Sequence, residues 1–335
     1  MSSIPGPWPG VSVFLAVRDE ADHLEQAIDQ IFVQGYPGPF EVVMAVGPSD
    51  DATEALAARL AERHPSLTVV PNPSGRTPEG LNRAWRAAAH DYLVRVDGHS
   101  LLPPGYIRRA VEVLEETGAA NAGGMMVPEG TQPFQKAVAR AMSTPYGIGA
   151  ESFHTGGEAG PVKTVYLGSF RRADLDEVGG FNETFARAQD WELNHRLIEA
   201  GKVVWFDPAL GVIYRPRRNW RALASQFYST GRWRWRVIKT YPDTASARYL
   251  APPAAALAVG VGLVVGLAGL GRGRRRWAAA LAVPAIYAAG VAGASGLASK
   301  GLDNKARAWL PVVIATMHMA WGAGFWRGIL DGWRR

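Results

Sequence analysis

The sequence predicts an α/β domain with a parallel sheet, followed by an α-helical membrane region. Two observations lead to this prediction. Up to about residue 97, short apolar runs alternate with segments of helical periodicity, and from about residue 250 the composition shifts to Ala, Val, Gly and Leu. With 335 residues, the chain has room for one large α/β domain and a further part. It contains no cysteine, which excludes disulfide bonds and thiolate metal sites.

Each element of the α/β part is identified by its own pattern. Strands are predicted at the short apolar runs 11–17, 40–46, 67–70 and 92–97. Helices are predicted between them, where apolar residues recur every three or four positions, at 19–32, 51–63 and 77–89. Strands separated by helices imply parallel pairing through right-handed crossovers, hence a Rossmann-like nucleotide-binding fold. No G-x-G-x-x-G follows the first strand, which argues against a dinucleotide-dependent dehydrogenase.

The tripeptide Asp97-Gly98-His99 closes the fourth predicted strand. In open α/β sheets, ligands bind outside the carboxyl ends of the strands. A carboxylate and an imidazole at that edge could hold a divalent cation against a nucleotide diphosphate. An Asp-Gly pair is also an ordinary turn, so the tripeptide by itself leaves both interpretations open.

Five motifs in order resemble those of family 2 inverting glycosyltransferases of the GT-A fold, and among them the membrane-bound succinoglycan-type exopolysaccharide glucosyltransferases. They are VSVFLAVRDEADHLEQAIDQIF, EVVMAVGPSDDAT, NPSGRTPEGLNRAW, VRVDGHS and RAQDWELNHRL, within residues 10–250. The resemblance implies a GT-A catalytic domain over residues 1–216. It also implies that Asp97 faces the nucleoside and its ribose and that His99 ligates the metal that holds the diphosphate. Asp is more usual at that position, and an imidazole favours Mn²⁺ over Mg²⁺. The alternative for His99 is a hydrogen-bonding histidine after a strand.

The nucleotide pocket of the family begins just after the first strand, where this chain has Arg18. Many relatives carry an acidic residue at the position of Val46, which contacts uracil, and valine cannot make that hydrogen bond. We expect Asp51 or its neighbour Asp50 to replace it, or Arg76 to stack on the base. The alternative for Asp51 is helix capping.

Asp190 is predicted to be the general base. Inverting transfer is a single in-line displacement, in which a carboxylate takes the proton of the attacking acceptor hydroxyl. Glu192 and Arg196 lie four positions apart on a helix and can pair, which leaves Asp190 as the available carboxylate; its alternative role is an N-cap. Gln189 stands where the family more often has Glu, and Trp191 offers an apolar platform to an acceptor sugar.

The acceptor side is predicted to include Gly168 and Ser169, together with Arg232 and Trp233. The last two belong to a basic, aromatic segment, 217–248, which suits helices in a bilayer interface. The alternative is a helix whose aromatic residues are core. No nucleic-acid fold signature accompanies the arginines, so nucleic acid is not an expected partner. Processive relatives have Gln-x-x-Arg-Trp here, whereas this chain has Ser at the Gln position, and we expect addition of one sugar per acceptor.

Residues 249–335 are predicted to form the membrane region. Its uncharged stretches give three spans, at about 252–270, 277–298 and 308–328, close to the 20 residues that a bilayer requires. The arginine-rich loop 272–276 would then lie outside, against the positive-inside tendency. A first segment that re-enters the membrane without crossing is the alternative.

The resemblance implies an inverting, metal-dependent glycosyltransferase that moves a hexose, with glucose expected, from a UDP-sugar to a polyprenyl-linked glycan. The expected location is the inner membrane, multi-pass, with the catalytic domain cytoplasmic, because nucleotide sugars are cytoplasmic. The rivals are a polyprenyl-monophosphate sugar transferase and a catalytically silent membrane scaffold or sensor. The sequence leaves the donor base, the linkage and the oligomeric state open.

Overall fold

The computed structural model describes residues 6–147 and 152–333. Contacts divide the chain into two compact units. The first unit comprises Met1–Val127 and Glu151–Tyr214, and the second comprises Pro128–Ala150 and Arg215–Arg335. The sequence division into 1–216 and two later segments did not separate residues 128–150, which the structure groups with the C-terminal helices.

The first unit is built on an eight-stranded sheet with the order β3-β2-β1-β4-β8-β5-β9-β7. Strands β1 to β4 pair in parallel, which confirms the predicted parallel sheet for this part. Strand β8 then runs antiparallel to both β4 and β5. A separate two-stranded sheet pairs β10 with β6. The strands are β1 Val11–Val17, β2 Phe40–Val46, β3 Leu67–Pro71, β4 Tyr92–Arg95, β5 Asn121–Gly124, β6 Met126–Pro128, β7 Gly160–Pro161, β8 Tyr166–Arg171, β9 Val204–Phe206 and β10 Val212–Tyr214.

Helices cover both faces of the large sheet because the side chains of its strands alternate between two apolar clusters. Val13 and Leu15 of β1 belong to a cluster with α1, α2 and α4, whereas Phe14 between them belongs to a cluster with α3, α7 and α8. The helices are α1 Leu24–Phe32, α2 Thr53–Arg63, α3 Thr77–Ala87, α4 Tyr106–Thr117, α6 Ser152–Thr155, α7 Arg172–Glu177 and α8 Gln189–Glu199.

The predicted helix 19–32 begins later than expected, at Leu24. The preceding residues are held in a turn by the loop before α2. The backbone N–H of Ala21 donates to the carboxylate of Asp51 (3.0 Å), and that of Glu20 donates to the hydroxyl of Thr53 (2.8 Å). These bonds fix the chain directly after β1, at the edge of the sheet where the candidate site lies.

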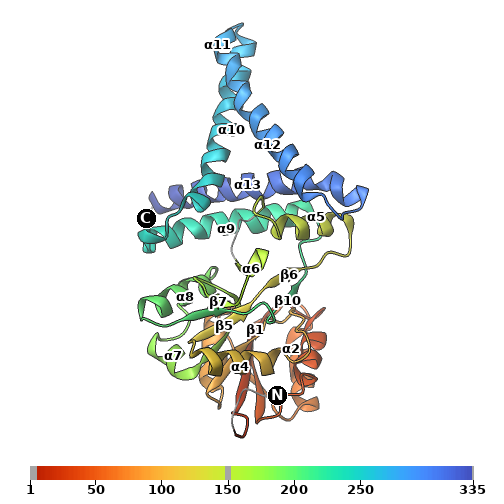
Figure 1. Ribbon diagram of the computed structural model, residues 1–335, viewed down its shortest axis with the longest axis vertical. Coiled ribbons are helices and arrows are strands. Elements are labelled where there is room, and N and C mark those ends of the chain that lie inside the picture. The colour runs from red at the N-terminus through yellow and green to blue at the C-terminus, as the bar shows by residue number, and fades with distance from the viewer. Residues whose placement is uncertain (1–5, 148–151, 334–335) are drawn as a thin grey trace. The chain divides into compact units, whose positions relative to one another are not determined.

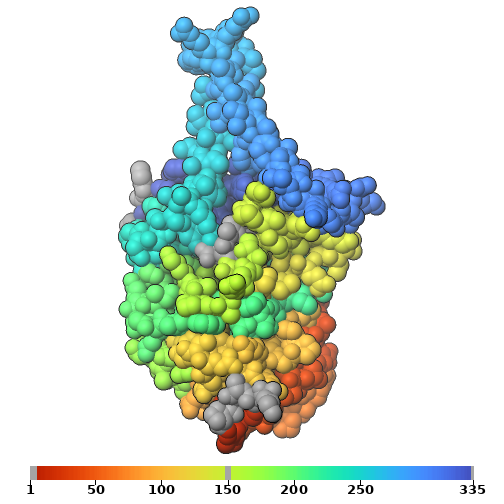
Figure 2. Space-filling view, viewed as in Figure 1, coloured from red at the N-terminus to blue at the C-terminus, as the bar shows by residue number. Residues whose placement is uncertain are grey.

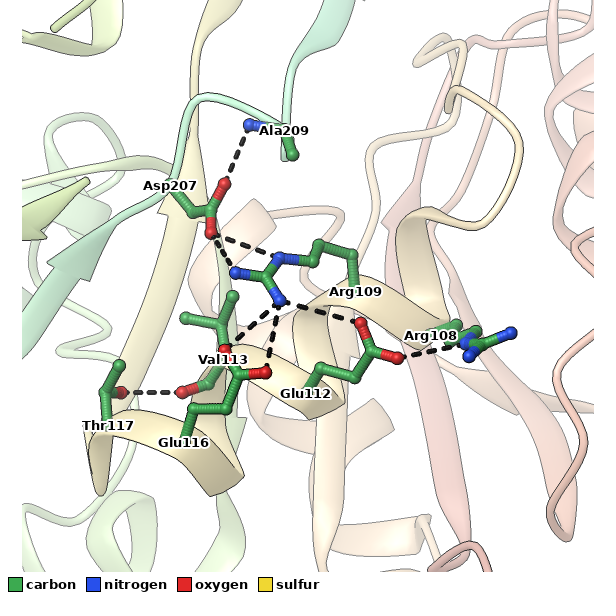
Figure 3. A network of polar contacts seen from close by, with 8 residues as sticks. All are labelled: Arg108, Arg109, Glu112, Val113, Glu116, Thr117, Asp207 and Ala209. Atoms are coloured by element: carbon green, nitrogen blue, oxygen red, sulfur yellow. Dashed lines mark hydrogen bonds and ion pairs between the residues drawn. The ribbon is translucent and has the colours of Figure 1, made fainter. Parts of the chain in front are cut away.

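A polar network around Arg109 ties α4 to the loop that follows β9 (Figure 3). The guanidinium donates to the nearly buried carboxylate of Asp207 from Nε (3.2 Å) and Nη2 (2.7 Å), and pairs with Glu116 at 3.2 Å. Asp207 also accepts the backbone N–H of Ala209 (2.8 Å). Because both carboxylates have the same cationic partner, the network stabilises the loop without leaving a buried charge unpaired.

The second unit is helical. Its helices are α5 Pro133–Met142, α9 Trp220–Thr240, α10 Ala247–Gly271, α11 Arg275–Ala278, α12 Ala282–Ala298 and α13 Asn304–Trp333, with 3₁₀ turns η1 Pro242–Thr244 and η2 Ala279–Leu281. In Figure 1, α10 and α12 form a hairpin with α11 at its tip, and α13 lies across the base of the hairpin, beside α9 and α5. Phe134 of α5 packs edge-on against Trp309 of α13, and Lys136 pairs with Asp303 just before it (3.2 Å).

Three segments are long and apolar enough to cross a membrane: Ala247–Gly271, Arg275–Ala298 and Asn304–Gly332. They coincide with the three predicted spans, so the prediction of an apolar helical region after the α/β domain is confirmed. The basic, aromatic segment that precedes them is mostly one long helix, α9, which packs along α13.

Candidate active site

The centre of the candidate site is a buried arginine that joins two carboxylates. Arg95 is the last residue of β4 and is 3% exposed. Its Nη2 donates to Oδ1 of Asp97 (2.9 Å), and its Nη1 pairs with Oδ1 of Asp190 at the start of α8. The side chains of Asp97 and Asp190 are 24% and 32% exposed, so the cation lies inside and both acids remain accessible.

The backbone before α8 orients Asp190. Ala188 has φ 61°, a left-handed conformation that a residue with a β-carbon seldom adopts. It directly precedes Gln189, the first residue of α8, so the chain turns sharply into the helix and Asp190 lies in the first turn. Strain of this kind is typical of functional sites, where the surrounding structure maintains it.

The charges around Asp190 oppose one another. Burial raises the pKa of Asp190; Arg95 acts in the opposite direction and Asp97 adds to the increase, with a net upward shift. For Arg95, burial lowers the pKa, but Asp190 and Asp97 more than compensate, and the group stays protonated. Burial also raises the pKa of Tyr166 well above its usual range, with a further contribution from Asp97. The site therefore contains one fixed cation, two carboxylates and a neutral phenol.

His99 lies beside a carboxylate from the loop after β1. Its Nδ1 is 2.7 Å from Oε1 of Glu20, and the imidazole is 40% exposed. A carboxylate against one ring nitrogen fixes the orientation of an imidazole, as it does for many metal-ligating histidines. Among the described residues, no three His, Cys, Asp or Glu side chains are grouped to hold a metal ion. The chain thus offers an aspartate and a histidine two positions apart, a donor set whose chemistry suits Mn²⁺ if the substrate and water supply the other ligands.

The loops after β1, β2 and β3 converge at this edge of the sheet. Gly47 packs so closely on Gly75 that an added Cβ would be 2.9 Å from the Gly75 Cα, and a Cβ on Gly75 would be 3.2 Å from the guanidinium of Arg18. Gly75 also has φ 61°, so this close approach requires glycine. Arg18 and Arg76, predicted to bind the donor, are thereby brought together, whereas Val46 ends β2 within the sheet.

The two arginines predicted to bind the donor nucleotide each have polar partners within the protein. Arg18 pairs with Asp19 (3.3 Å) and is half exposed. Arg76 pairs with Glu79 (2.7 Å) and donates to the carbonyl of Glu183 (2.5 Å).

Asp51 uses both of its carboxylate oxygens locally, toward Thr53 and the backbone N–H of Ala21. These hydrogen bonds lower the pKa of Asp51. The N-cap of α2 is Ala52, so Asp51 lies one position before the cap and its carboxylate accepts the backbone N–H of Thr53. A role of Asp51 in base recognition stays a prediction.

The residues predicted for the acceptor side fall into three groups. Gly168 and Ser169 lie in the middle of β8 and are buried, which leaves no surface for an acceptor to touch.

Gln189 and Trp191 flank Asp190 on α8 and are partly exposed, and the indole of Trp191 stacks on His195 at 5.2 Å. The third group, Arg232 and Trp233, lies on α9 of the second unit.

In that third group, Arg232 pairs with Asp331 (2.8 Å). The guanidinium of Arg236 lies 5.1 Å from the ring of Trp233.

The predicted pairing of Glu192 with Arg196 is confirmed. Glu192 is fully buried and accepts from Nε (2.9 Å) and Nη2 (2.8 Å) of Arg196, and from Asn182 (3.1 Å). Arg196 also donates to the carbonyl of Gly180 (2.7 Å). Glu192 therefore anchors the loop that leads to Asp190 and is not available for chemistry.

Two residues of the site were missed in the sequence, Arg95 and Glu20. A signal for Arg95 was present, since an arginine inside an apolar strand must find a carboxylate when the strand is buried. Glu20 gave no such signal, because it is one of several acids in the turn after β1.

Comparisons with known proteins identify the family of the chain. Residues 12–179 match the family described as Glycosyl transferase family 2. The succinoglycan biosynthesis protein ExoA of Rhizobium meliloti is 31% identical over 326 residues, which cover 96% of each chain.

Solved structures share the fold. The mannosyltransferase PcManGT of Pyrobaculum calidifontis, in complex with GDP-Man and Mn²⁺, has a TM-score of 0.61 and 22% identity, covering 98% of this chain and 91% of its own. S. aureus TarS 1–349 with UDP-GlcNAc has a TM-score of 0.52 and 13% identity, covering 96% and 92%. The chain belongs to glycosyl transferase family 2 and is a glycosyltransferase, with a GT-A catalytic domain followed by helices long and apolar enough to span a membrane.

Proposed function

We propose that this glycosyltransferase is an inverting, metal-dependent enzyme of exopolysaccharide assembly. It transfers a hexose, glucose by preference, from a UDP-sugar to a polyprenyl-linked glycan at the cytoplasmic face of the inner membrane. Support comes from the relative named for succinoglycan biosynthesis and from structural neighbours that hold GDP-Man with Mn²⁺ or UDP-GlcNAc. The observation that carries the mechanism is the pairing of Asp97 and Asp190 with one buried arginine.

Asp190 acts as the general base. The acceptor hydroxyl oxygen attacks the anomeric carbon while the bond from that carbon to the diphosphate oxygen breaks, and the hydroxyl proton passes to the Asp190 carboxylate. The products are the inverted glycoside and a nucleoside diphosphate. The upward shift in the pKa of Asp190 makes the carboxylate a better proton acceptor than an ordinary aspartate, and its exposed side gives the acceptor access.

Asp97 and His99 would hold the divalent metal, and the bound metal would supply positive charge to the leaving diphosphate. Glu20 orients the imidazole of His99 through the contact at Nδ1. Arg95 pairs with both carboxylates and offsets part of their negative charge. Arg18 and Arg76 lie at the same edge of the sheet and add positive charge where a nucleotide phosphate would bind.

The test is a panel of nucleotide sugars incubated with the full-length protein, Mn²⁺ and a bacterial membrane lipid extract, with the lipid products identified by mass. The expected result is one hexose added to a polyprenyl-diphosphate-linked glycan, with UDP-glucose the preferred donor and with inversion at the anomeric carbon. A product in which the hexose is attached directly to a polyprenyl monophosphate would replace the proposed acceptor. No turnover of any nucleotide sugar by the folded wild-type protein would contradict the proposal.

A further inference from the structure

The hairpin of α10 and α12 has the surface of a membrane-embedded element. Near the tip, α10 packs closely on the returning chain: a Cβ on Gly262, Gly266 or Gly269 would lie within 3 Å of residues 277–281 of α11 and η2. Such close backbone approach is how helices associate in lipid. The outer surface of the hairpin exposes large apolar side chains, among them Val261, Val264, Leu267, Leu270, Ile286 and Leu297. Figure 2 shows the hairpin as a narrow projection with its sides uncovered.

The hairpin is also long enough to cross the bilayer. Helix α10 has 25 residues, about 37 Å at the rise of an α-helix, against about 30 Å for the hydrocarbon core. Its tip carries four exposed arginines: Arg272, Arg274, Arg275 and Arg276. Guanidinium groups are costly within hydrocarbon, so a tip that ended inside the core would be unstable, whereas one that reaches the opposite headgroups would not.

Helix α13 is arranged differently from the other two apolar segments. Figure 1 shows it lying across the base of the hairpin. It meets the first turns of α10, where the Trp326 indole donates to the carbonyl of Pro253 (2.8 Å) and Gly322 packs on Pro252. In the most apolar stretch of α13, 44% of the helix is buried inside the protein, whereas in that of α10 only 17% is buried.

Helix α13 is bound along its length to α9. A Cβ on Gly231 of α9 would collide with the carbonyl of Trp321, and a Cβ on Gly324 of α13 would collide with that of Tyr228, so the two backbones touch at successive turns. Helix α9 carries five cations in 21 residues: Arg221, Arg232, Arg234, Arg236 and Lys239. If α13 crossed the bilayer, it would carry this basic helix into the hydrocarbon, and that cost opposes a transmembrane orientation.

The two sides of α13 fit an interfacial position. One side is buried in protein through Leu310, Val313, Ile314 and Met317. The other exposes Trp309, Val312, Trp326 and Leu330 together with Arg327. Tryptophan and arginine on one exposed, otherwise apolar face are typical of helices that lie in the headgroup region.

We propose that the chain crosses the membrane twice, through the α10–α12 hairpin, and that α13 lies along the membrane surface with α9. The interaction surface of α13 is therefore a lipid headgroup layer, and the C-terminal end of α13 is on the same side of the membrane as the catalytic unit. This inference does not depend on the donor, acceptor or metal proposed above.

The absence of native cysteine makes the topology directly testable. Single cysteines are introduced into the full-length protein at exposed Glu62 on α2, exposed Lys300 between α12 and α13, exposed Arg274 at the hairpin tip, and Gly332 at the end of α13. A Cβ at Gly332 would be 3.5 Å from its nearest neighbour, so Gly332→Cys fits without rearrangement. A membrane-impermeant maleimide is applied to intact spheroplasts and to inverted vesicles.

The expected result is that Glu62→Cys, Lys300→Cys and Gly332→Cys are labelled in inverted vesicles, and Arg274→Cys in spheroplasts. Labelling of Gly332→Cys from the same side as Arg274→Cys would show that α13 crosses and would overturn the proposal. Labelling of Arg274→Cys from the same side as Glu62→Cys would show a hairpin that dips without crossing, and would overturn it equally. Labelling of all four cysteines after detergent solubilisation serves as the control for reactivity.

Discussion

The guanidinium of Arg95 pairs with the carboxylate of Asp190, a residue 95 positions later in the chain. Through this pair, the end of a central strand fixes the first turn of α8 and therefore the position of the proposed base. The same guanidinium holds Asp97, so a single buried cation positions the proposed base and a proposed metal ligand together.

Replacing Arg95 tests this arrangement. In Arg95→Met, two acids lose their cation at a buried position, and the free energy of unfolding should fall by about 3–5 kcal/mol, as when one partner of a buried pair is removed. Arg95→Lys keeps the charge but lacks the planar fork that reaches both acids, so it should fold but lose at least roughly tenfold in turnover. Thermal unfolding and turnover of the detergent-solubilised proteins measure the two effects. An Arg95→Met protein as stable as the wild type would show that the pair does not organise the site.

Asp190→Asn preserves shape but cannot accept the acceptor proton. Turnover should fall by roughly 10²–10⁴, the usual contribution of a general base, while the dissociation constant for the nucleotide sugar stays nearly unchanged. Asp176→Asn, which changes an exposed carboxylate on α7, is the matched control and should remain fully active. If donor affinity collapses and turnover of bound donor survives, Asp190 binds nucleotide and is not the base.

The pH dependence follows from the raised pKa of Asp190. The base works only when ionised, so turnover should decline on acidification around a pKa above that of an ordinary aspartate. Arg95 lowers this pKa, so the decline should move to higher pH in Arg95→Met, which removes the cation. The free energy of unfolding should depend on pH in the opposite direction to turnover. Because the pKa of Asp190 is higher in the folded state, the contribution of this residue to stability is complete at low pH. That contribution is lost as the pH rises through the pKa of the folded state. A turnover profile that is flat down to the pKa of an unperturbed aspartate would contradict the assignment.

The metal role of His99 is tested by two substitutions. His99→Ala should abolish stimulation of turnover by Mn²⁺. His99→Asp should retain activity and shift the preference toward Mg²⁺, because oxygen ligands suit that ion. Turnover is measured against the concentration of each ion. Full activity of His99→Ala at limiting Mn²⁺ would exclude His99 as a ligand.

The sequence predicted the parts of the fold that depend on local pattern. The four parallel strands and the apolar helices were identified because their periodicity reflects burial of whole elements, and the pairing of Glu192 with Arg196 was identified because four residues make one helical turn. The antiparallel insertion of β8 between β4 and β5 and the late start of α1 depend on contacts between distant segments, which periodicity does not encode. Gly168 and Ser169 were predicted to lie on the acceptor side because they precede the Asp190 motif in the chain. In the structure, both are buried in β8, between β4 and β5.

Helix α5 belongs with α13, and its Lys136 pairs with Asp303, 167 residues further along the chain. During synthesis at 5–20 residues per second, roughly 8 to 33 s pass between the emergence of these two residues from the ribosome. In that interval the side of α5 that packs on α13, including Phe134, lacks this partner, although the strands on either side of the segment can already pair. The final step of folding therefore waits for α13 to be translated. A truncation that removes α13 would expose apolar, aggregation-prone side chains on α5, in the middle of the chain, as well as on the helices near its end.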